Sequence, residues 1–204
     1  MKAMIFLDYE NFWIATNNYY RKILKRSTTP RLNYDKLPIE IVRRLPQPHS
    51  LVKTFIFAPK PDDFLMEDES RVNAYNWLHS LNDHNFLSVV EGRHVARPTG
   101  IGEMDVTDPT TYYVEEKGTD VNLAVHVLTK AFHNSFDTAI IVSADSDHIP
   151  IMDVLNEMGK SVVVVGVVGQ NLSKQKQHSD MQIYLSESNF NRCLLYPSYR
   201  FVSQ

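Results

Sequence analysis

Two aspartates stand directly after an apolar run in the last third of the chain. The run 138–142 is rich in Ile and Val, which is typical of a strand buried on both faces of a sheet. It is followed by Asp145 and Asp147 and then by helix signals, with Pro150 fitting a first turn. Crowded carboxylates repel one another unless a cation or a proton neutralises them, so this position indicates a ligand site. Either aspartate could instead cap the following helix, and the pair alone leaves both interpretations open.

Two further aspartates are expected close to this pair. Asp8 follows the apolar run 2–7, and Asp120 falls at the start of a helix expected over 121–132. The carboxyl ends of parallel strands share one edge of a sheet, so Asp8 and Asp145 converge if their strands are neighbours. Asp120 joins them if its helix enters from the same side. Several converging carboxylates favour Mg²⁺ or Mn²⁺, which lower the pKa of bound water and hold phosphate oxygens.

Other catalytic signatures are missing from the sequence. It contains no HExxH zinc motif, no Walker phosphate loop and no GxSxG elbow, and the stretch 100–102 lacks the third glycine of a dinucleotide fingerprint. The spacing of Asp145 and Asp147 also matches the nucleophile and acid of haloacid-dehalogenase-like phosphatases. Those families carry the pair early in the chain, with Thr or Val after it, so a small-substrate phosphatase is the weaker alternative.

The apolar pattern predicts strands that alternate with helices. Such an alternation implies right-handed crossovers and a mostly parallel sheet with helices on both faces. We expect strands at 2–7, 51–58, 86–90, 111–114, 138–142, 160–168 and 183–185, helices at 11–26, 35–45, 72–81 and 121–132, one after Pro150 and a short one at 171–178, and a loop or hairpin at 93–111.

The composition is that of one ordinary α/β domain. The chain has 204 residues, 43% of them hydrophobic, which suffices for one full core. No apolar run approaches the roughly 20 residues of a membrane span, and the N-terminus turns acidic too early for a signal peptide. A single cysteine, Cys193, excludes an internal disulfide and fits a reducing compartment, so we expect a cytoplasmic protein without a membrane partner.

Charge is spread unevenly along the chain. The net charge is −3, yet residues 1–60 hold eleven Lys or Arg and only four acids, a local charge of +7. A basic flank beside an acidic centre suits a metal-dependent enzyme that acts on a polyanion. We expect a nucleic-acid track at Arg21, Lys22, Lys25 and Arg26, although cations near a helix C-terminus also complement its dipole.

The ordered set of these motifs resembles the NYN domain, a group of PIN-like nucleases that includes the LabA-like proteins. The resemblance covers about residues 2–186. It implies a Rossmann-like (PIN-like) three-layer sandwich over 1–186, with 187–204 as a tail that packs on the domain or on a dimer partner. The matching elements are Asp8-x-x-Asn11, Lys117-Gly118-Thr119-Asp120-Val121, Ser143-Ala144-Asp145-Ser146-Asp147, and Asp180 before the last strand.

By motif match, the resemblance implies an RNA endonuclease that uses Mg²⁺ or Mn²⁺. Its catalytic, metal-binding acids would be Asp8, Asp120 and Asp145, with Asp147 as a further ligand. The supporting residues would be Asn11, Ser143, Lys117 and Asp180.

One position departs from the pattern. His126 stands six residues after Asp120, where many LabA-like members carry another aspartate. The alternative function is therefore a catalytically inactive module that binds RNA or regulates.

The remaining aromatic and histidine residues are expected to be structural. Trp13 and Trp77 are expected in the core or at its rim rather than as base-stacking platforms. His148 could contact a phosphate, but we expect it to cap or pack locally. The aromatic stretch 190–201 could fold back on the core or form a homodimer face.

Overall fold

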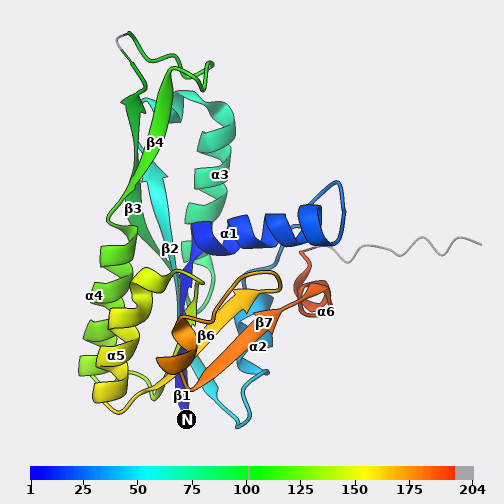
Figure 1. The fold of residues 1–204 in the computed structure, drawn as a ribbon, viewed down its shortest axis with the longest axis vertical. Coiled ribbons are helices and arrows are strands. Elements are labelled where there is room, and N and C mark those ends of the chain that lie inside the picture. Colours follow the sequence, from blue (N-terminus) through cyan, green and yellow to red (C-terminus); the bar gives the residue numbers. More distant parts are fainter. Residues whose placement is uncertain (101, 196–204) are drawn as a thin grey trace, which may run out of the picture.

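The protein folds around a seven-stranded sheet flanked by helices (Figure 1). The computed structural model describes residues 1–100 and 102–195. The strand order is β4-β3-β2-β1-β5-β6-β7, and every neighbouring pair is parallel except β3 and β4. The strands are β1 Lys2–Asp8, β2 Ser50–Pro61, β3 Leu87–Pro98, β4 Tyr112–Lys117, β5 Thr138–Val142, β6 Ser161–Val167 and β7 Met181–Leu185.

The sheet has its topological switch point between β1 and β5: β2 to β4 follow on one side of β1, and β5 to β7 on the other. Leu7 of β1 pairs with Val142 of β5, so Asp8 and Ser143 lie side by side just beyond this pair. In open α/β sheets the crevice at such a switch point, outside the carboxyl ends of the strands, is where ligands bind. The predicted convergence of these two strands is therefore confirmed.

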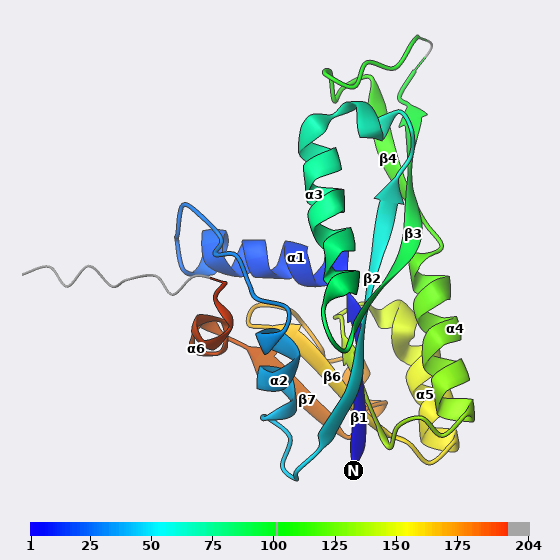
Figure 2. The same ribbon diagram turned by 180° about the vertical axis from the view of Figure 1, so that it is seen from behind.

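Helices cover both faces of the sheet (Figures 1 and 2). Ala3, Ile5 and Leu7 belong to a core shared with α1, α2 and α6, whereas Met4 and Phe6 belong to a second core under α4 and α5. Because side chains alternate along a strand, Asp8 points to the α4 and α5 face. The helices are α1 Tyr9–Asn18, α2 Lys36–Val42, α3 Glu69–Ser80, α4 Thr119–Phe132, α5 Ile149–Glu157 and α6 Glu187–Phe190.

Short 3-10 and π segments extend or join these helices. A π-helical turn, Tyr19–Ile23, continues α1, so the helix predicted over 11–26 ends earlier than expected. The 3-10 turns are Leu65–Glu67, Leu81–Asp83, Ser146–His148, Gln175–Gln177 and Asn191–Cys193. The helix predicted over 171–178 was wrong, since only the turn Gln175–Gln177 forms there and the Asn171 side chain caps the backbone before it.

The predicted loop or hairpin over 93–111 is a hairpin, and its first arm is a longer strand than the sequence indicated. β3 continues to Pro98 and pairs with the antiparallel β4, and both strands extend beyond the rest of the sheet. A small separate core supports this hairpin, with Ala96 and Tyr112 packed against the buried Leu65. Proline and glycine residues at the hairpin tip obscured the strand pattern in the sequence.

The chain after β7 returns to the α1 face. Phe190 is fully buried and its ring lies 5.9 Å from that of Tyr20, while Asn189 donates a hydrogen bond to the buried Glu40 carboxylate at 2.9 Å. Leu194 forms a β-bridge with Leu32. Residues 196–204, which carry most of the aromatic stretch predicted as a homodimer face, lie outside the described residues. Within the described part of the chain, no helix is long and apolar enough to cross a membrane.

Candidate metal centre

The Asp8 carboxylate is fixed at the end of β1. Its residue is only 8% exposed. Oδ1 accepts the Asn11 backbone N–H at 3.2 Å, which caps α1, and Oδ2 accepts the hydroxyl of the buried Ser143 at 3.0 Å. Hydrogen bonds from both neighbouring segments therefore hold a nearly buried anion in one orientation.

Asp120 and His148 approach the same carboxylate from two other elements. Asp120 lies in the first turn of α4 with its side chain 63% exposed, whereas His148 ends the 3-10 turn Ser146–His148 and is 1% exposed. The His148 Nε2 lies 3.6 Å from Asp8 Oδ2 and 4.0 Å from Asp120 Oδ1. One atom from each residue falls within 4.8 Å of the others, which is close enough for one metal ion. We call this group the primary cluster.

The His148 nitrogen that faces the primary cluster has no hydrogen-bond partner among the described residues. A buried polar atom without a partner carries a free-energy penalty, which a bound ion or a proton shared with the carboxylates would remove. The residues present thus fit a divalent cation with two carboxylate ligands and one imidazole ligand.

The charges within the primary cluster perturb one another. Burial raises the pKa of Asp120, and the nearby carboxylates of Asp8 and Asp145 raise it further against the opposing effect of His148. Burial disfavours the imidazolium of His148, but the carboxylates of Asp8, Asp120 and Asp145 together outweigh burial and raise the pKa of His148 above its ordinary value. Titratable groups whose pKa values are shifted by burial and by specific charged neighbours are characteristic of functional sites.

A network of amide side chains supports the loop after β5. The Asn11 Oδ1 accepts the Ala144 backbone N–H at 3.1 Å and the Gln170 side-chain amide at 2.9 Å. The buried Gln175 donates to the Ala144 carbonyl at 2.8 Å. Asn11 therefore joins the start of α1 to the β5 loop, and its oxygen is already occupied.

Asp145 and Asp147 lie beside the primary cluster rather than inside it. The Asp145 Oδ1 accepts the Asp147 backbone N–H at 2.9 Å and caps the 3-10 turn, so the capping interpretation of this residue is confirmed. Asp145 still lies close enough to perturb the pKa of both Asp120 and His148. Asp147 is exposed at the rim.

A second group of acids and histidine adjoins the primary cluster. The His94 Nε2 lies 2.9 Å from Glu10 Oε1, and Glu116 completes a group within metal-ligand distance. Burial and the neighbouring Glu10 raise the pKa of Glu116 to about 7, with a smaller contribution from Asp8. For Glu10, bonds from His94 and Glu116 overcome burial and lower its pKa. This group was not predicted, because the sequence does not determine the register that pairs His94 with Glu116 across the hairpin.

Two glycines allow α4 to start beside β3. A Cβ at Gly92 would lie 2.1 Å from Thr119 Oγ1 and 2.9 Å from Thr119 N, so no larger residue fits without movement. Gly118 has φ of 81° and forms the N-cap of α4, a conformation that glycine adopts at low cost. This close approach places Asp120 at the carboxyl edge of the sheet.

Two other predicted residues lie outside the primary cluster. Lys117 is exposed and pairs with Glu115 at 3.2 Å. Asp180 precedes β7 at the opposite edge of the sheet, where its carboxylate accepts the Val162 backbone N–H at 2.8 Å. The expected supporting role of Asp180 is thus corrected to a structural one, since a strand of five residues, about 17 Å long, separates the two edges.

His126 does not contact the primary cluster. Its ring packs against Phe55 and Phe57 of β2, with ring centres 5.4 and 5.6 Å apart. Burial and Lys130 lower the pKa of His126, which favours the neutral ring.

The basic residues of the predicted track lie at the far end of α1. Arg21 and Lys22 belong to the π-helical turn, and Arg26 pairs with Glu187 at 3.2 Å. The ten residues of α1, about 15 Å at 1.5 Å per residue, separate this turn from Asp8. A polyanion would have to run along α1 to touch both.

The fold and the cluster define an α/β protein with an acidic centre at the switch point of its sheet. The NYN domain model matches residues 2–186, and the chain belongs to this family. The fold is similar to the crystal structure of a protein of unknown function from Vibrio parahaemolyticus, with a TM-score of 0.57, 17% identity, and coverage of 95% of this chain and 96% of that chain. A search of curated proteins found no match.

Proposed function

We propose that the protein is a metal-dependent ribonuclease that hydrolyses RNA phosphodiester bonds at the primary cluster. Membership of a family of PIN-like nucleases supports a nucleic-acid substrate. The observation that carries the proposal is the buried Nε2 of His148, which has no partner among the described residues and faces the carboxylates of Asp8 and Asp120. The strand order β3-β2-β1-β5-β6 also supports a fold of the Rossmann-like, PIN-like kind.

Asp8, Asp120 and His148 would hold the ion, and Asp145 and Asp147 would add negative charge at its rim. Carboxylate oxygens accept either Mg²⁺ or Mn²⁺, whereas an imidazole ligand favours Mn²⁺. When bound, such an ion supplies an acidified water and neutralises charge on phosphate oxygens. Ser143 and Asn11 hold the Asp8 carboxylate ready for this role without further reorganisation.

Glu116 is the group best suited to take a proton from the attacking water. Its pKa of about 7 matches neutral pH, where a general base works most efficiently. His94 contacts the Glu10 carboxylate, and the negative charge of Glu10 favours the protonated form of Glu116. The pair would thus store and release one proton beside the primary cluster.

A catalytically inactive module that binds RNA or regulates is the second candidate. The close group contains two carboxylates and one histidine rather than four carboxylates, and His126 contributes nothing to it. A weaker negative charge would hold Mg²⁺ less tightly and could leave RNA binding without turnover.

Incubation of a mixed pool of single-stranded and structured RNA with Mn²⁺, with Mg²⁺ and with EDTA tests the proposal. The nuclease cuts with a metal and not with EDTA. RNA that is bound but uncut under all three conditions supports the second candidate instead.

A further inference from the structure

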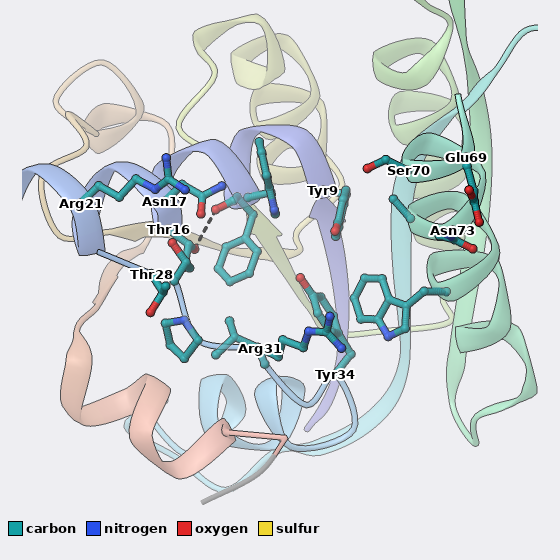
Figure 3. A pocket seen from close by; sticks show the side chains of 17 residues that line it. Tyr9, Thr16, Asn17, Arg21, Thr28, Arg31, Tyr34, Glu69, Ser70 and Asn73 are labelled. Carbon is teal, nitrogen blue, oxygen red and sulfur yellow. Dashed lines mark hydrogen bonds between the residues drawn. The ribbon is translucent and has the colours of Figure 1, made fainter. Parts of the chain in front are cut away.

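A cavity of about 1000 Å³ lies between α1, the segment 28–34 and α3 (Figure 3). It opens on the face of the sheet opposite the α4 and α5 layer, since Phe12 and Tyr34 in its floor belong to the α1 core. Its volume is at the upper end of the roughly 300–1,000 Å³ of small-ligand pockets. No residue of the primary cluster lines this cavity.

Both tryptophans of the chain line the cavity. Trp13 projects from α1 and is 54% exposed, and Trp77 projects from α3 and is 40% exposed. The Trp77 ring rests edge-on against the buried Tyr34, with ring centres 5.7 Å apart, and Tyr34 contacts Tyr9 at 6.2 Å. A large aromatic ring that is backed by a buried ring, as Trp77 is, and remains partly exposed is a suitable platform for stacking a base. The partial exposure of the two tryptophans fits the expected position at the rim of the core, and it leaves both rings accessible to a base.

The polar lining suits a nucleotide. Arg21 and Arg31 are exposed and make no ion pair among the described residues, while Glu69 is the one acid among the residues that line the cavity. In Figure 3 Arg21 extends from α1 and Arg31 from the segment 28–34, while Asn17 and Asn73 line the cavity from α1 and α3. Arginines bind phosphates, and amide side chains can donate to and accept from base edges. The Thr29 hydroxyl of this wall is buried and has no partner among the described residues.

The cavity and the primary cluster lie on two sides of the same helix turn. Tyr9 lines the cavity and directly follows Asp8 in the chain. Arg21, at the far end of the cavity, belongs to the basic turn that continues α1. A strand that leaves the cluster along α1 therefore passes over the cavity.

We propose that this cavity binds nucleotides of single-stranded RNA, with bases stacked on Trp13 and Trp77 and phosphates held by Arg21 and Arg31. The occupant is single-stranded because bases within a duplex are already stacked and cannot reach the indole rings. The excess of arginine over acid in the lining favours a polyanion over an apolar peptide. This inference deepens the proposed function and rests on it for the identity of the substrate.

Tryptophan fluorescence tests the inference directly, because the chain has no tryptophan outside the cavity. The titrant is a short oligouridylate, added to the full-length Asp120→Asn protein in EDTA so that nothing is cut. We expect saturable quenching of the emission, with a midpoint equal to the Kd from anisotropy of a labelled oligouridylate. A blunt RNA duplex should bind more weakly.

Variants separate the two kinds of contact. Trp77→Ala should weaken binding roughly 5- to 100-fold, and Trp77→Phe less, while Phe132→Ala on α4 should have no effect. Arg31→Gln should make the slope of log Kd against log salt shallower by about 0.7, whereas Arg44→Gln should not. Melting temperatures confirm that each variant is folded.

The outcomes separate this inference from the nuclease proposal. RNA that binds by anisotropy without quenching, or with the same affinity for Trp77→Ala and Arg31→Gln, overturns the cavity assignment even if the wild type cuts RNA. Tighter binding of the duplex overturns it as well. Quenching that the variants abolish, in a protein that never cuts RNA, supports the cavity and contradicts the nuclease.

Discussion

The Nε2 of His148 lies 3.6 Å from the Oδ2 of Asp8, with both residues almost removed from solvent. This separation exceeds that of a hydrogen bond, and the nitrogen has no other partner among the described residues. Ser143 already occupies the same Asp8 oxygen through its hydroxyl. The gap between nitrogen and oxygen is therefore the position from which a cation would contact both, and several predictions depend on it.

Replacing His148 with Asn should change which metal the protein prefers. An imidazole ligand favours Mn²⁺ over Mg²⁺, so the wild type should bind Mn²⁺ at least tenfold more tightly, and His148→Asn should lose most of this preference. Titration calorimetry with each metal measures the two affinities. The exposed His133→Asn serves as the control and should leave both unchanged. An undiminished preference in His148→Asn would show that the imidazole is not a ligand.

Removing the Ser143 hydroxyl should loosen the Asp8 carboxylate. A hydrogen bond to a charged group contributes about 1.5–3 kcal/mol, so Ser143→Ala should lower the free energy of unfolding by about that amount. Loss of an orienting partner should also weaken Mn²⁺ binding by roughly 10- to 100-fold. Urea denaturation and calorimetry measure the two effects, with the exposed Ser173→Ala as control. Unchanged metal affinity in a destabilised Ser143→Ala protein would contradict the positioning role.

Glu116 should make stability depend on pH in the absence of metal. Its pKa rises from 4.5 to about 7 on folding, so the folded state binds the proton more tightly and stability falls as the pH rises through this interval. Glu116→Gln cannot lose a proton and should be more stable than the wild type at pH 8, but not at pH 4. Because Glu116 is exposed, solvent screening reduces the gain, and we expect a Tm increase of about 2–4 °C.

Thermal melts in EDTA across this pH range test the prediction for Glu116. Glu157→Gln, at the exposed end of α5, is the matched control and should show no pH-dependent difference. Equal melting of Glu116→Gln and the wild type at pH 8 would mean that Glu10 and Glu116 do not share a proton.

Much of the site could be predicted from the order of the elements. Asp8 follows a buried strand and Asp120 opens a helix, so a parallel sheet with the right strand order brings them together. The order of strands and helices can be recognised in the sequence because apolar residues recur with a different spacing in a strand and in a helix. Asp145 fits the same pattern, yet local backbone capping occupies one of its oxygens.

The remaining site residues required three-dimensional contacts. His148 sits in a short 3-10 turn without periodicity, and its burial depends on how α5 packs over β5. His94 and Glu116 depend on the register of an irregular hairpin, in which they pair across β3 and β4. No local pattern in the sequence distinguishes such residues from ordinary surface histidine and glutamate.

Gly92 should tolerate no side chain. Gly92→Ala places a Cβ 2.1 Å from Thr119 Oγ1, so β3 or the start of α4 must move, at a cost of about 1–3 kcal/mol. The shift should also displace Asp120 and weaken Mn²⁺ binding. Gly102→Ala, whose Cβ would have nothing within 4 Å, should leave stability and binding unchanged. Denaturation and metal titration of both variants make the comparison, and equal behaviour would contradict the close packing of β3 on α4.

The most direct test of the metal-dependent nuclease is single-turnover cleavage of RNA in Mn²⁺ by the wild type, Asp120→Asn and Glu157→Gln. Asp120 is exposed, so its replacement should leave the fold intact while removing one ligand of the primary cluster. We predict that Asp120→Asn cuts at least a hundredfold more slowly and that Glu157→Gln cuts like the wild type. Equal rates for Asp120→Asn and the wild type, with cleavage still abolished by EDTA, would contradict the assignment of the primary cluster as the catalytic metal centre.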